Sequence, residues 1–172
     1  SVVLDSSTGA WLATYDGKLY YFDREEFHLV RAMNITIQSR LCLDKTERLW
    51  VGTYGMGLYC YELNRIRVFQ EEQGLPTNSV LCLAEDKEEG NIWIGTRKGM
   101  ARWTGERVDS ENMHHTEDIE ITKLIEGKNG NIWIGTRFGR LLSYDKVRMQ
   151  AETFFISSIM DKYTIGSMAE DM

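Results

Sequence analysis

The sequence predicts an all-β fold, a β-propeller segment of about four four-stranded antiparallel blades. The first observation is a tryptophan that recurs at spacings of 39, 43 and 40 residues, as Trp11, Trp50, Trp93 and Trp133. The second is that the residues after each tryptophan align without a gap and share a threonine, as Thr14, Thr53, Thr96 and Thr136. The third is a set of runs rich in β-branched and aromatic residues around each tryptophan, with no good helical stripe.

Each repeat is expected to form a four-stranded meander. In the third repeat we expect a first strand at Val80–Glu85, followed by a polar turn at Lys87–Asn91 and a second strand at Ile92–Thr96. A tight turn at Arg97–Gly99 then leads to a third strand at Met100–Trp103 and a weak fourth strand at Glu106–Asp109. The corresponding apolar runs upstream of the tryptophan in the other repeats are Val2–Asp5, Leu41–Asp44 and Ile121–Gly127. The fourth strands elsewhere are Phe27–Val30, Ile66–Phe69 and Glu152–Ile156.

The repeats divide residues 1–172 into one partial propeller domain, with no separate second domain. Their approximate ranges are 1–38, 39–78, 79–119 and 120–163, and a fifth repeat is expected to start at 164–172. Ile165–Asp171 matches Val80–Asp86 closely, so we expect the fifth repeat to be truncated. A superhelical β-solenoid is the structural alternative, although its coils are usually shorter than these repeats.

The shared tryptophan, small residue and threonine have a packing explanation. Blades taper toward a central channel, so Ala13, Gly52, Gly95 or Gly135 lets the next sheet approach while the indole fills the space between blades. An aromatic platform for sugars is the alternative. It fits less well because the same residue recurs in every blade.

Composition restricts the function classes. The formal net charge is −6 and the basic residues are scattered, which argues against nucleic-acid binding. The three cysteines are an odd count at strand positions, which predicts free, buried thiols rather than a disulfide framework. Cys42 and Cys82 each lie in a Leu-Cys-Leu tripeptide, forty residues apart, and are expected at matching places in their repeats, whereas Cys60 lies in the alternating run Leu58–Tyr61.

The segments Glu85–Gly99, Glu126–Gly139 and Gln73–Val80 resemble the two-component regulator propeller repeat. The resemblance covers nearly the whole chain and is weaker in the first repeat, which has Ala13 in place of glycine. The second repeat has Glu47-Arg48 where the family has a Gly-Asn turn.

The resemblance implies the extracytoplasmic sensor region of a bacterial hybrid two-component system, of the kind found in gut Bacteroidetes. It implies a periplasmic location, further propeller blades, a β-sandwich, a membrane span and a histidine kinase in the parent protein. The ligands that it implies are oligosaccharides or polysaccharide breakdown products. No kinase, receiver or DNA-binding segment is present in these 172 residues.

The variable residues directly after each threonine are the candidate ligand-binding residues. They lie in turns that share one face of a propeller with the blade-to-blade connections, including Leu75–Ser79. Tyrosine and arginine there could stack on sugar rings and pair with sulfate or carboxylate groups. The candidates are Tyr15, Tyr54, Arg97, Lys98, Arg137 and Phe138. The alternative is that they are solvated turn residues.

Metal, cofactor and catalytic sites are not predicted. His114-His115 has no cysteine or third histidine nearby, and the acidic turns lack the alternating ladder of a calcium loop. No hydrolase, protease or phosphate-loop motif is present. We therefore expect no enzyme activity in this segment, although the repeats also look somewhat similar to those of propeller lyases such as streptogramin lyase.

The leading prediction is a propeller segment that senses oligosaccharides for a two-component kinase. The alternative from another class is a structural or dimerisation scaffold without its own ligand. A lyase-type enzyme is the third. Four open blades would leave sheet faces exposed, so we also expect self-association.

Overall fold

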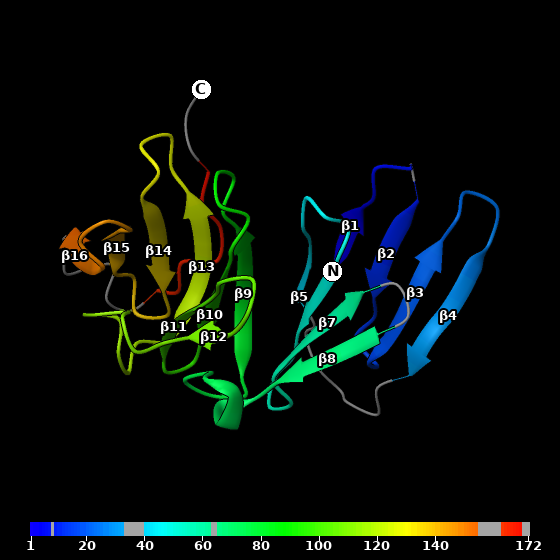
Figure 1. Ribbon diagram of the computed structural model, residues 1–172, viewed down its shortest axis with the longest axis horizontal. Helices are drawn as coiled ribbons and strands as arrows, with labels where there is room; N and C mark the ends of the chain where they lie inside the picture. The colour runs from blue at the N-terminus through cyan, green and yellow to red at the C-terminus, as the bar shows by residue number, and fades with distance from the viewer. Residues whose placement is uncertain (8, 33–39, 63–64, 155–162, 170–172) are drawn as a thin grey trace.

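A computed structural model describes residues 1–7, 9–32, 40–62, 65–154 and 163–169 of the chain. These residues form four antiparallel sheets of four strands each, as predicted (Figure 1). The only helical segment among them is the short 3-10 turn η1 (Glu71–Gln73). None of the described residues forms a helix that is long and apolar enough to cross a membrane.

Each sheet is a meander of consecutive strands, here called a blade. Blade 1 contains β1 (Val2–Leu4), β2 (Ala10–Ala13), β3 (Lys18–Phe22) and β4 (Phe27–Ala32). Blade 2 contains β5 (Arg40–Leu43), β6 (Leu49–Gly52), β7 (Leu58–Glu62) and β8 (Arg65–Phe69). Blade 3 contains β9 (Val80–Glu85), β10 (Ile92–Thr96), β11 (Gly99–Trp103) and β12 (Val108–Asp109). Blade 4 contains β13 (Ile121–Glu126), β14 (Ile132–Thr136), β15 (Leu141–Asp145) and β16 (Gln150–Phe154).

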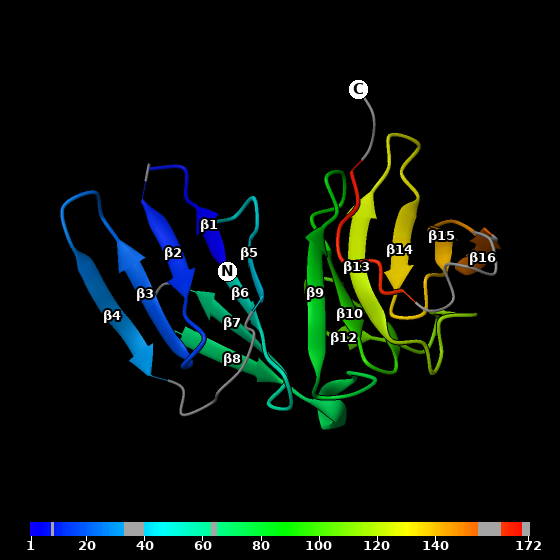
Figure 2. The same ribbon diagram turned by 180° about the vertical axis from the view of Figure 1, so that it is seen from behind.

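The blades follow one another in chain order around a shared middle (Figures 1 and 2). The first strands β1, β5 and β9 lie toward the middle, and β4 and β16 lie at the two outer ends. The weak fourth strand predicted at Glu106–Asp109 is confirmed but has only two residues. Of the fourth strand predicted at Glu152–Ile156, residues 155 and 156 lie outside the described part of the chain.

Three hydrophobic clusters fill the three spaces between neighbouring blades. Because side chains alternate along a strand, each blade has one face that carries its tryptophan and another that carries the residues beside it. The tryptophan face of one blade packs on the opposite face, here called the front face, of the next. Trp50 of blade 2, for example, shares a cluster with Ile92 and Ile94 of blade 3.

The small residue after each tryptophan has the packing role that the sequence predicts. A Cβ atom at Gly95 would lie 2.7 Å from Cγ2 of Ile121, and one at Gly135 would lie 2.7 Å from Cγ2 of Ile165. Ile121 begins β13 of the next blade, and Ile165 lies at the equivalent place beyond blade 4. Real Cβ contacts are never this short, so glycine is required for the observed distance between blades.

Ile165 supports the predicted start of a fifth repeat. Its backbone N–H donates to the carbonyl of Thr136 at 3.0 Å, as the N–H of Val80 donates to Thr53 at 2.8 Å. Residues 165–169 are not assigned as a strand, because no ladder partner for them occurs among the described residues. Residues 170 and 171 of the predicted repeat lie outside the described range.

The gap-free alignment is wrong in blade 3. Trp11, Trp50 and Trp133 each pair with the residue ten positions on, whereas Trp93 pairs with Arg102, nine positions on. The turn of blade 3 is one residue shorter than the others. Trp103 therefore lies on the front face and packs on blade 2 rather than on the tryptophan face of its own blade.

The cysteines are free, as expected, but Cys42 and Cys82 do not occupy matching places. Cys42 pairs with Trp50 and is half-buried, whereas Cys82 pairs with Gly95 and is buried. Strand β9 begins earlier than β5 relative to the tryptophan. The structural equivalent of Cys82 in blade 2 is thus Arg40, which pairs with Gly52.

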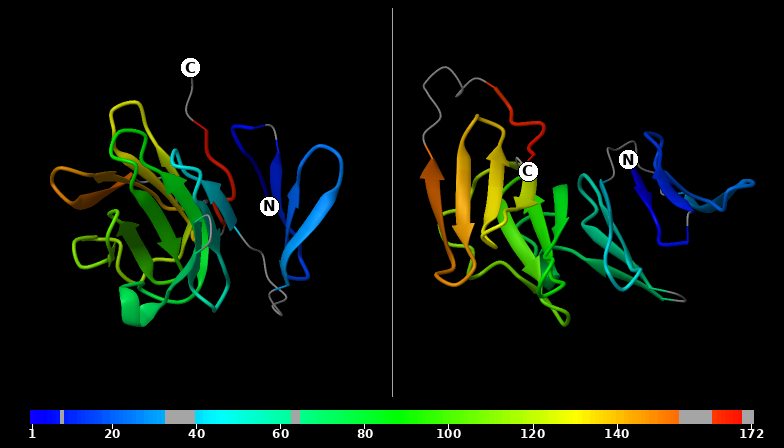
Figure 3. Two further views of the ribbon diagram at one scale, coloured as in Figure 1. Left: turned by 45° about the vertical axis from the view of Figure 1, so that its right-hand side comes forward. Right: turned by 90° about the horizontal axis from the view of Figure 1, so that it is seen from above.

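The front face of blade 1 has no covering blade among the described residues. Apolar side chains from all four strands share this face, and Val2, Leu4, Phe27 and Leu29 are more than half exposed at 62%, 72%, 60% and 56%. In blades 2 to 4 the equivalent face is buried against the preceding blade. Figure 3 shows that blade 1 lies at the end of the row.

Candidate ligand-binding rim

Each blade turns from its second to its third strand at a threonine whose hydroxyl closes the turn. The hydroxyl donates to a carbonyl three or four residues on, in the pairs Thr14–Lys18 at 3.1 Å, Thr53–Gly57 at 2.8 Å, Thr96–Gly99 at 2.8 Å and Thr136–Arg140 at 3.1 Å. The threonine is therefore needed for the turn itself. The residues that follow it are free to differ between blades.

The connections between blades lie against these turns and form one surface with them, here called the rim. The carbonyl of Ser79 accepts from the N–H of Arg97 at 3.2 Å, and the carbonyl of Glu120 accepts from the N–H of Arg137 at 3.0 Å. The Asn78 carbonyl also accepts from the N–H groups of Gly55 and Gly57. The predicted approach of Leu75–Ser79 to the turns is thus confirmed.

Side chains on the rim link three blades. The Arg97 guanidinium donates to the Tyr54 hydroxyl at 2.6 Å and lies over the Tyr54 ring, 5.5 Å from its centroid. Arg97 Nε also lies 3.8 Å from the Glu120 carboxylate, which Arg137 Nη1 contacts at 3.1 Å. Glu120 is therefore shared by arginines of blades 3 and 4, while Arg97 reaches back to blade 2.

A pocket of about 520 Å³ opens beside this chain of contacts, between the turns of blades 3 and 4. The charged groups that line it are Arg97, Asp118, Glu120 and Arg140, and Phe138 is 62% exposed. Arg140 forms no ion pair within the described part of the chain. The pocket thus combines an exposed aromatic ring, a cation without a carboxylate partner and a paired carboxylate.

The structure gathers four of the six candidate residues, Tyr54, Arg97, Arg137 and Phe138. Tyr15 is exposed in the turn of blade 1, and no contact that joins it to this group occurs among the described residues. Lys98 contacts Thr96 only through its backbone N–H and does not line the pocket. The two arginines are exposed but already contact Glu120 and Tyr54, so a ligand would compete with those partners.

Sequence reasoning missed Glu120 and Arg140. Glu120 is the residue directly before an inner strand, the position that Ser79 holds in blade 3, so the repeat alignment contained the signal. Arg140 follows the turn glycine at Gly139. Its place beside Phe138 depends on the longer turn of blade 4.

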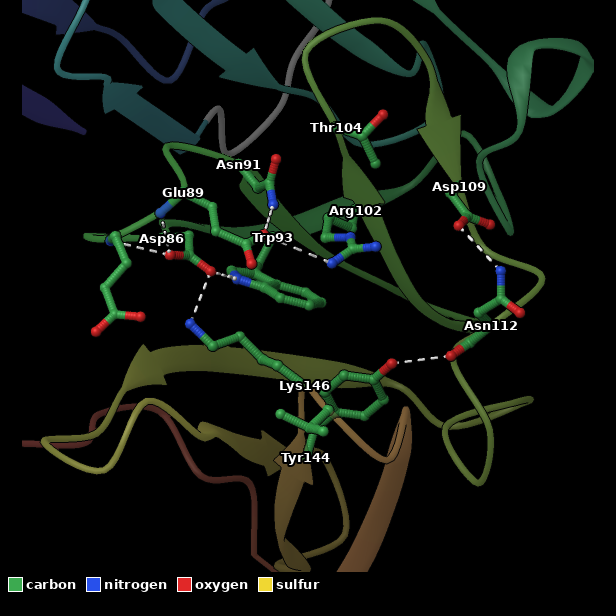
Figure 4. Close-up of polar contacts among 12 residues, drawn as sticks. Asp86, Glu89, Asn91, Trp93, Arg102, Thr104, Asp109, Asn112, Tyr144 and Lys146 are labelled. Atoms are coloured by element: carbon green, nitrogen blue, oxygen red, sulfur yellow. Dashed lines mark hydrogen bonds and ion pairs between the residues drawn. The ribbon is translucent and has the colours of Figure 1, made fainter.

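A second polar cluster lies away from the rim, at the opposite end of the blade 3–blade 4 boundary (Figure 4). Lys146 reaches across from blade 4 and contacts the carboxylates of Asp86 and Glu126, each at 2.9 Å. Asp86 also accepts from the indole N–H of Trp93 at 3.3 Å, as Asp44 does from Trp50 at 2.8 Å. This cluster anchors the tryptophan in the interface between blades.

The ionisation of the cluster follows from these contacts. Burial works to raise the pKa of Asp86, but hydrogen bonds from backbone N–H groups and from Lys146 hold it below its usual value. Burial works to lower the pKa of Lys146, and its two carboxylate partners raise it overall. Asp86 and Lys146 are therefore charged near neutral pH, and their ion pair holds blades 3 and 4 together.

Glu85 and Glu126 form a repeated link between blades. The backbone N–H of Lys45 donates to Glu85 at 2.7 Å, and that of Lys87 donates to Glu126 at 2.8 Å. In each case a carboxylate at the end of an inner strand accepts from the turn of the preceding blade. The acidic turns of the sequence thus have a structural role.

His114 and His115 lie in the connection between blades 3 and 4. His115 Nδ1 lies 3.2 Å from the carbonyl oxygen of Ala151. The backbones of His114 and Gln150 form an isolated parallel β-bridge. No group of three or more histidine, cysteine, aspartate or glutamate side chains that could hold a metal ion occurs among the described residues.

Comparisons with known proteins agree with the repeat geometry. The family model for the two-component regulator propeller matches residues 74–98 and 117–138, which contain all of β10 and all of β14. No curated protein matches the chain. Many solved structures do match it, and three are described here.

The extracellular domain of a putative hybrid two-component system from B. thetaiotaomicron has a TM-score of 0.71 and 21% identity over 90% of this chain. The extracellular domain of a putative one-component system from B. thetaiotaomicron has a TM-score of 0.71 and 16% identity over 94% of this chain. Virginiamycin B lyase from Staphylococcus aureus has a TM-score of 0.73 and 10% identity over 92% of this chain.

At these identities the structural matches establish the shared fold alone. The chain covers 22% and 25% of the two B. thetaiotaomicron domains and 56% of the lyase. The repeats, in contrast, are matched at sequence level in blades 3 and 4. The chain is therefore a β-propeller segment in which residues 74–98 and 117–138 match the two-component regulator propeller model.

Proposed function

We propose that this chain is a propeller segment from the extracytoplasmic sensor region of a bacterial two-component sensor, and that its rim recognises an oligosaccharide or polysaccharide breakdown product. The observation that carries the proposal is the pocket between blades 3 and 4. It places an exposed phenylalanine beside charged and hydrogen-bonding groups. Sugar recognition uses this combination, because a ring face stacks on aromatic carbon and the hydroxyls bind polar side chains.

The pairing of Glu120 gives a physical route from binding to signalling. Glu120 joins arginines of blades 3 and 4, and Arg97 joins Tyr54 of blade 2. A ligand that competes for Arg97 or Glu120 therefore changes contacts among three blades. A ligand that binds more tightly when these contacts are broken than when they are formed would shift the packing of the blades. A kinase in the parent protein would respond to that shift.

The test is a binding measurement on the 172-residue chain with a panel of neutral and uronic-acid-containing oligosaccharides. We expect a panel member to raise the melting temperature and to give a calorimetric isotherm. Phe138→Ala and Arg140→Ala should each weaken that binding by about tenfold, since each removes a stacking or charged contact.

Matched controls are Phe27→Ala, which removes a ring that is 60% exposed in blade 1, and Arg148→Ala, which removes an exposed arginine outside the pocket. These controls should keep wild-type affinity. A panel in which no oligosaccharide binds, or equal loss in the control variants, would contradict the proposal.

A second function, as a scaffold that associates through its blades, is favoured by the front face of blade 1. The same face is covered in the other three blades, and in each case the covering surface is the tryptophan face of a neighbouring blade. We therefore propose that a further blade of the parent protein, or a second copy of this chain, covers the exposed side chains of blade 1.

Light scattering on the isolated chain tests this second function. The wild-type chain should self-associate, and Leu4→Glu should reduce the association because it places a charge on the apolar face. Val147→Glu, at an isolated exposed residue in blade 4, is the control and should leave the association unchanged. A monomeric wild-type chain at high concentration would rule out self-association.

A further inference from the structure

Three residues at one register position meet in the middle of the molecule. Arg40 on β5, Cys82 on β9 and Lys123 on β13 each pair with the glycine of the second strand, Gly52, Gly95 and Gly135 respectively. The inner strands of neighbouring blades lie side by side, so these positions are adjacent around the axis. Two of the three equivalent positions are therefore basic, and they flank a thiol.

A cavity of about 310 Å³ lies at this place. Its wall includes Ser1, Arg40, Cys82, Thr122, Lys123 and Gly166. The cavity is separate from the rim pocket, with which it shares no lining residue. None of the described residues that line it is acidic.

The two cations have no carboxylate partner within the described part of the chain. Arg40 Nε donates to the carbonyl of Leu81 at 2.9 Å, which holds the guanidinium against β9 and leaves its terminal nitrogens as donors. Lys123 makes no ion pair among the described residues. Both cations act on the Cys82 thiol: burial raises its pKa to about 12, and Lys123 and Arg40 oppose that rise.

Lys123 differs from the other half-buried basic groups of this protein. The formal net charge of the chain is −6, and half-buried basic groups such as Lys146 and Arg48 contact carboxylates, whereas Lys123 faces the exposed Arg40 across the cavity. Two like charges that face one cavity repel each other, and an anion between them would remove that repulsion. Arginine donates two parallel N–H groups to an oxyanion, and lysine adds a third donor.

We propose that the axial cavity binds an oxyanion, held by Arg40 and Lys123. Phosphate, sulfate and the carboxylate of a uronic acid share the recognised chemistry, which is two or more oxygens that carry negative charge. Thr122 does not contribute its hydroxyl proton, because that hydroxyl already donates to the carbonyl of Ile165 at 2.7 Å. The two cationic side chains therefore supply the binding energy.

The experiment is isothermal titration of the 172-residue chain with sodium sulfate, sodium phosphate and sodium glucuronate, each at the same ionic strength as a sodium chloride reference. We expect saturable binding of at least one of the three. Arg40→Met and Lys123→Met should each weaken it by about tenfold or more, since each removes a charge-assisted hydrogen bond. Binding by the inorganic ions identifies a free anion, and binding by glucuronate alone identifies a sugar acid.

Two controls separate the cavity from general salt effects. Arg148→Met removes an exposed arginine outside the cavity and should bind as the wild type does. An N-terminally acetylated chain removes the charge of Ser1, which also lines the cavity and donates one hydrogen bond to the Ala13 carbonyl at 3.0 Å, and it should still bind because Arg40 and Lys123 remain. Equal binding in Lys123→Met and the wild type, loss of binding on acetylation, or no saturable binding by any of the three anions would overturn the proposal.

Discussion

Gly95 in blade 3 lies so close to Ile121 in blade 4 that an added Cβ atom would be 2.7 Å from the isoleucine Cγ2. The isoleucine side chain has no room to retreat, because it is fully buried in the cluster between the two blades. This contact fixes the distance between neighbouring sheets. It also assigns the repeated small residue to architecture and leaves recognition to the variable turn.

Gly95→Ala should lower the free energy of unfolding by about 1–3 kcal/mol, the usual cost of an extra methyl group in a packed core. Urea denaturation followed by tryptophan fluorescence measures it. Gly166→Ala is the matched control, because a Cβ atom there meets nothing within 4 Å. A variant at Gly95 as stable as the control would show that the blades can separate without cost.

Thr53→Val should destabilise the chain by about 1 kcal/mol, whereas Thr53→Ser should not. The threonine hydroxyl donates to the Gly57 carbonyl at 2.8 Å and accepts from the N–H of Met56 at 3.2 Å. Valine has the same shape but makes neither bond. Thermal unfolding of the two variants measures the difference, and equal stability of the two would contradict the role assigned to the hydroxyl.

Lys146→Met should cost roughly 2–4 kcal/mol at pH 7, because it leaves two carboxylates together without their cation. Folding lowers the pKa of Asp86, so the ionised Asp86 carboxylate stabilises the folded wild type at pH values above the usual pKa of an aspartate. This contribution to the free energy of unfolding is lost as the pH falls through the lowered pKa of the folded state. The pKa of Lys146 is raised, so its contribution is lost only as pH rises through that raised value.

In the Lys146→Met variant, Asp86 has lost its cationic partner and can offset that loss by binding a proton. The stability difference from wild type should therefore shrink between pH 7 and pH 4.5, as measured by urea unfolding at both pH values. Lys18→Met breaks an exposed pair with Asp16 and should cost much less stability than Lys146→Met, because solvent screens the exposed pair. A difference that grows as the pH falls would contradict the charge state given to the cluster.

The native thiols should resist alkylation. Burial raises the pKa of Cys42 and Cys82 to about 12 and that of Cys60 to about 11, so almost no thiolate is present at pH 8. Intact mass after brief treatment with iodoacetamide should show no adduct in the native chain and three in urea. Rapid labelling of the native chain would show that a cysteine is accessible in solution.

The blades could be predicted from sequence because each repeat carries the same local signals. Alternating apolar residues set the strands, and the tryptophan and threonine mark the second strand and its turn. The shorter turn of blade 3 could not be predicted, since deleting one residue from a turn leaves Trp93–Trp103 looking aligned with its counterparts. Only the pairing of Trp93 with Arg102 reveals the change of register.

The rim was predictable in part. The turns after each threonine identified Arg97 and Arg137, but their shared partner Glu120 lies in a connection whose sequence differs from blade to blade. Contacts between blades depend on residues about forty positions apart and on the twist between sheets. A pattern read within one repeat does not contain them.

The most direct test of the account compares Phe138→Ala and Gly95→Ala in one experiment that records both melting temperature and oligosaccharide affinity. The account assigns Phe138 to recognition and Gly95 to blade packing. Phe138→Ala should lose affinity at an unchanged melting temperature, and Gly95→Ala should melt earlier while the folded chain keeps wild-type affinity. The reverse pattern, or loss of both properties in both variants, would contradict the separation of architecture from recognition.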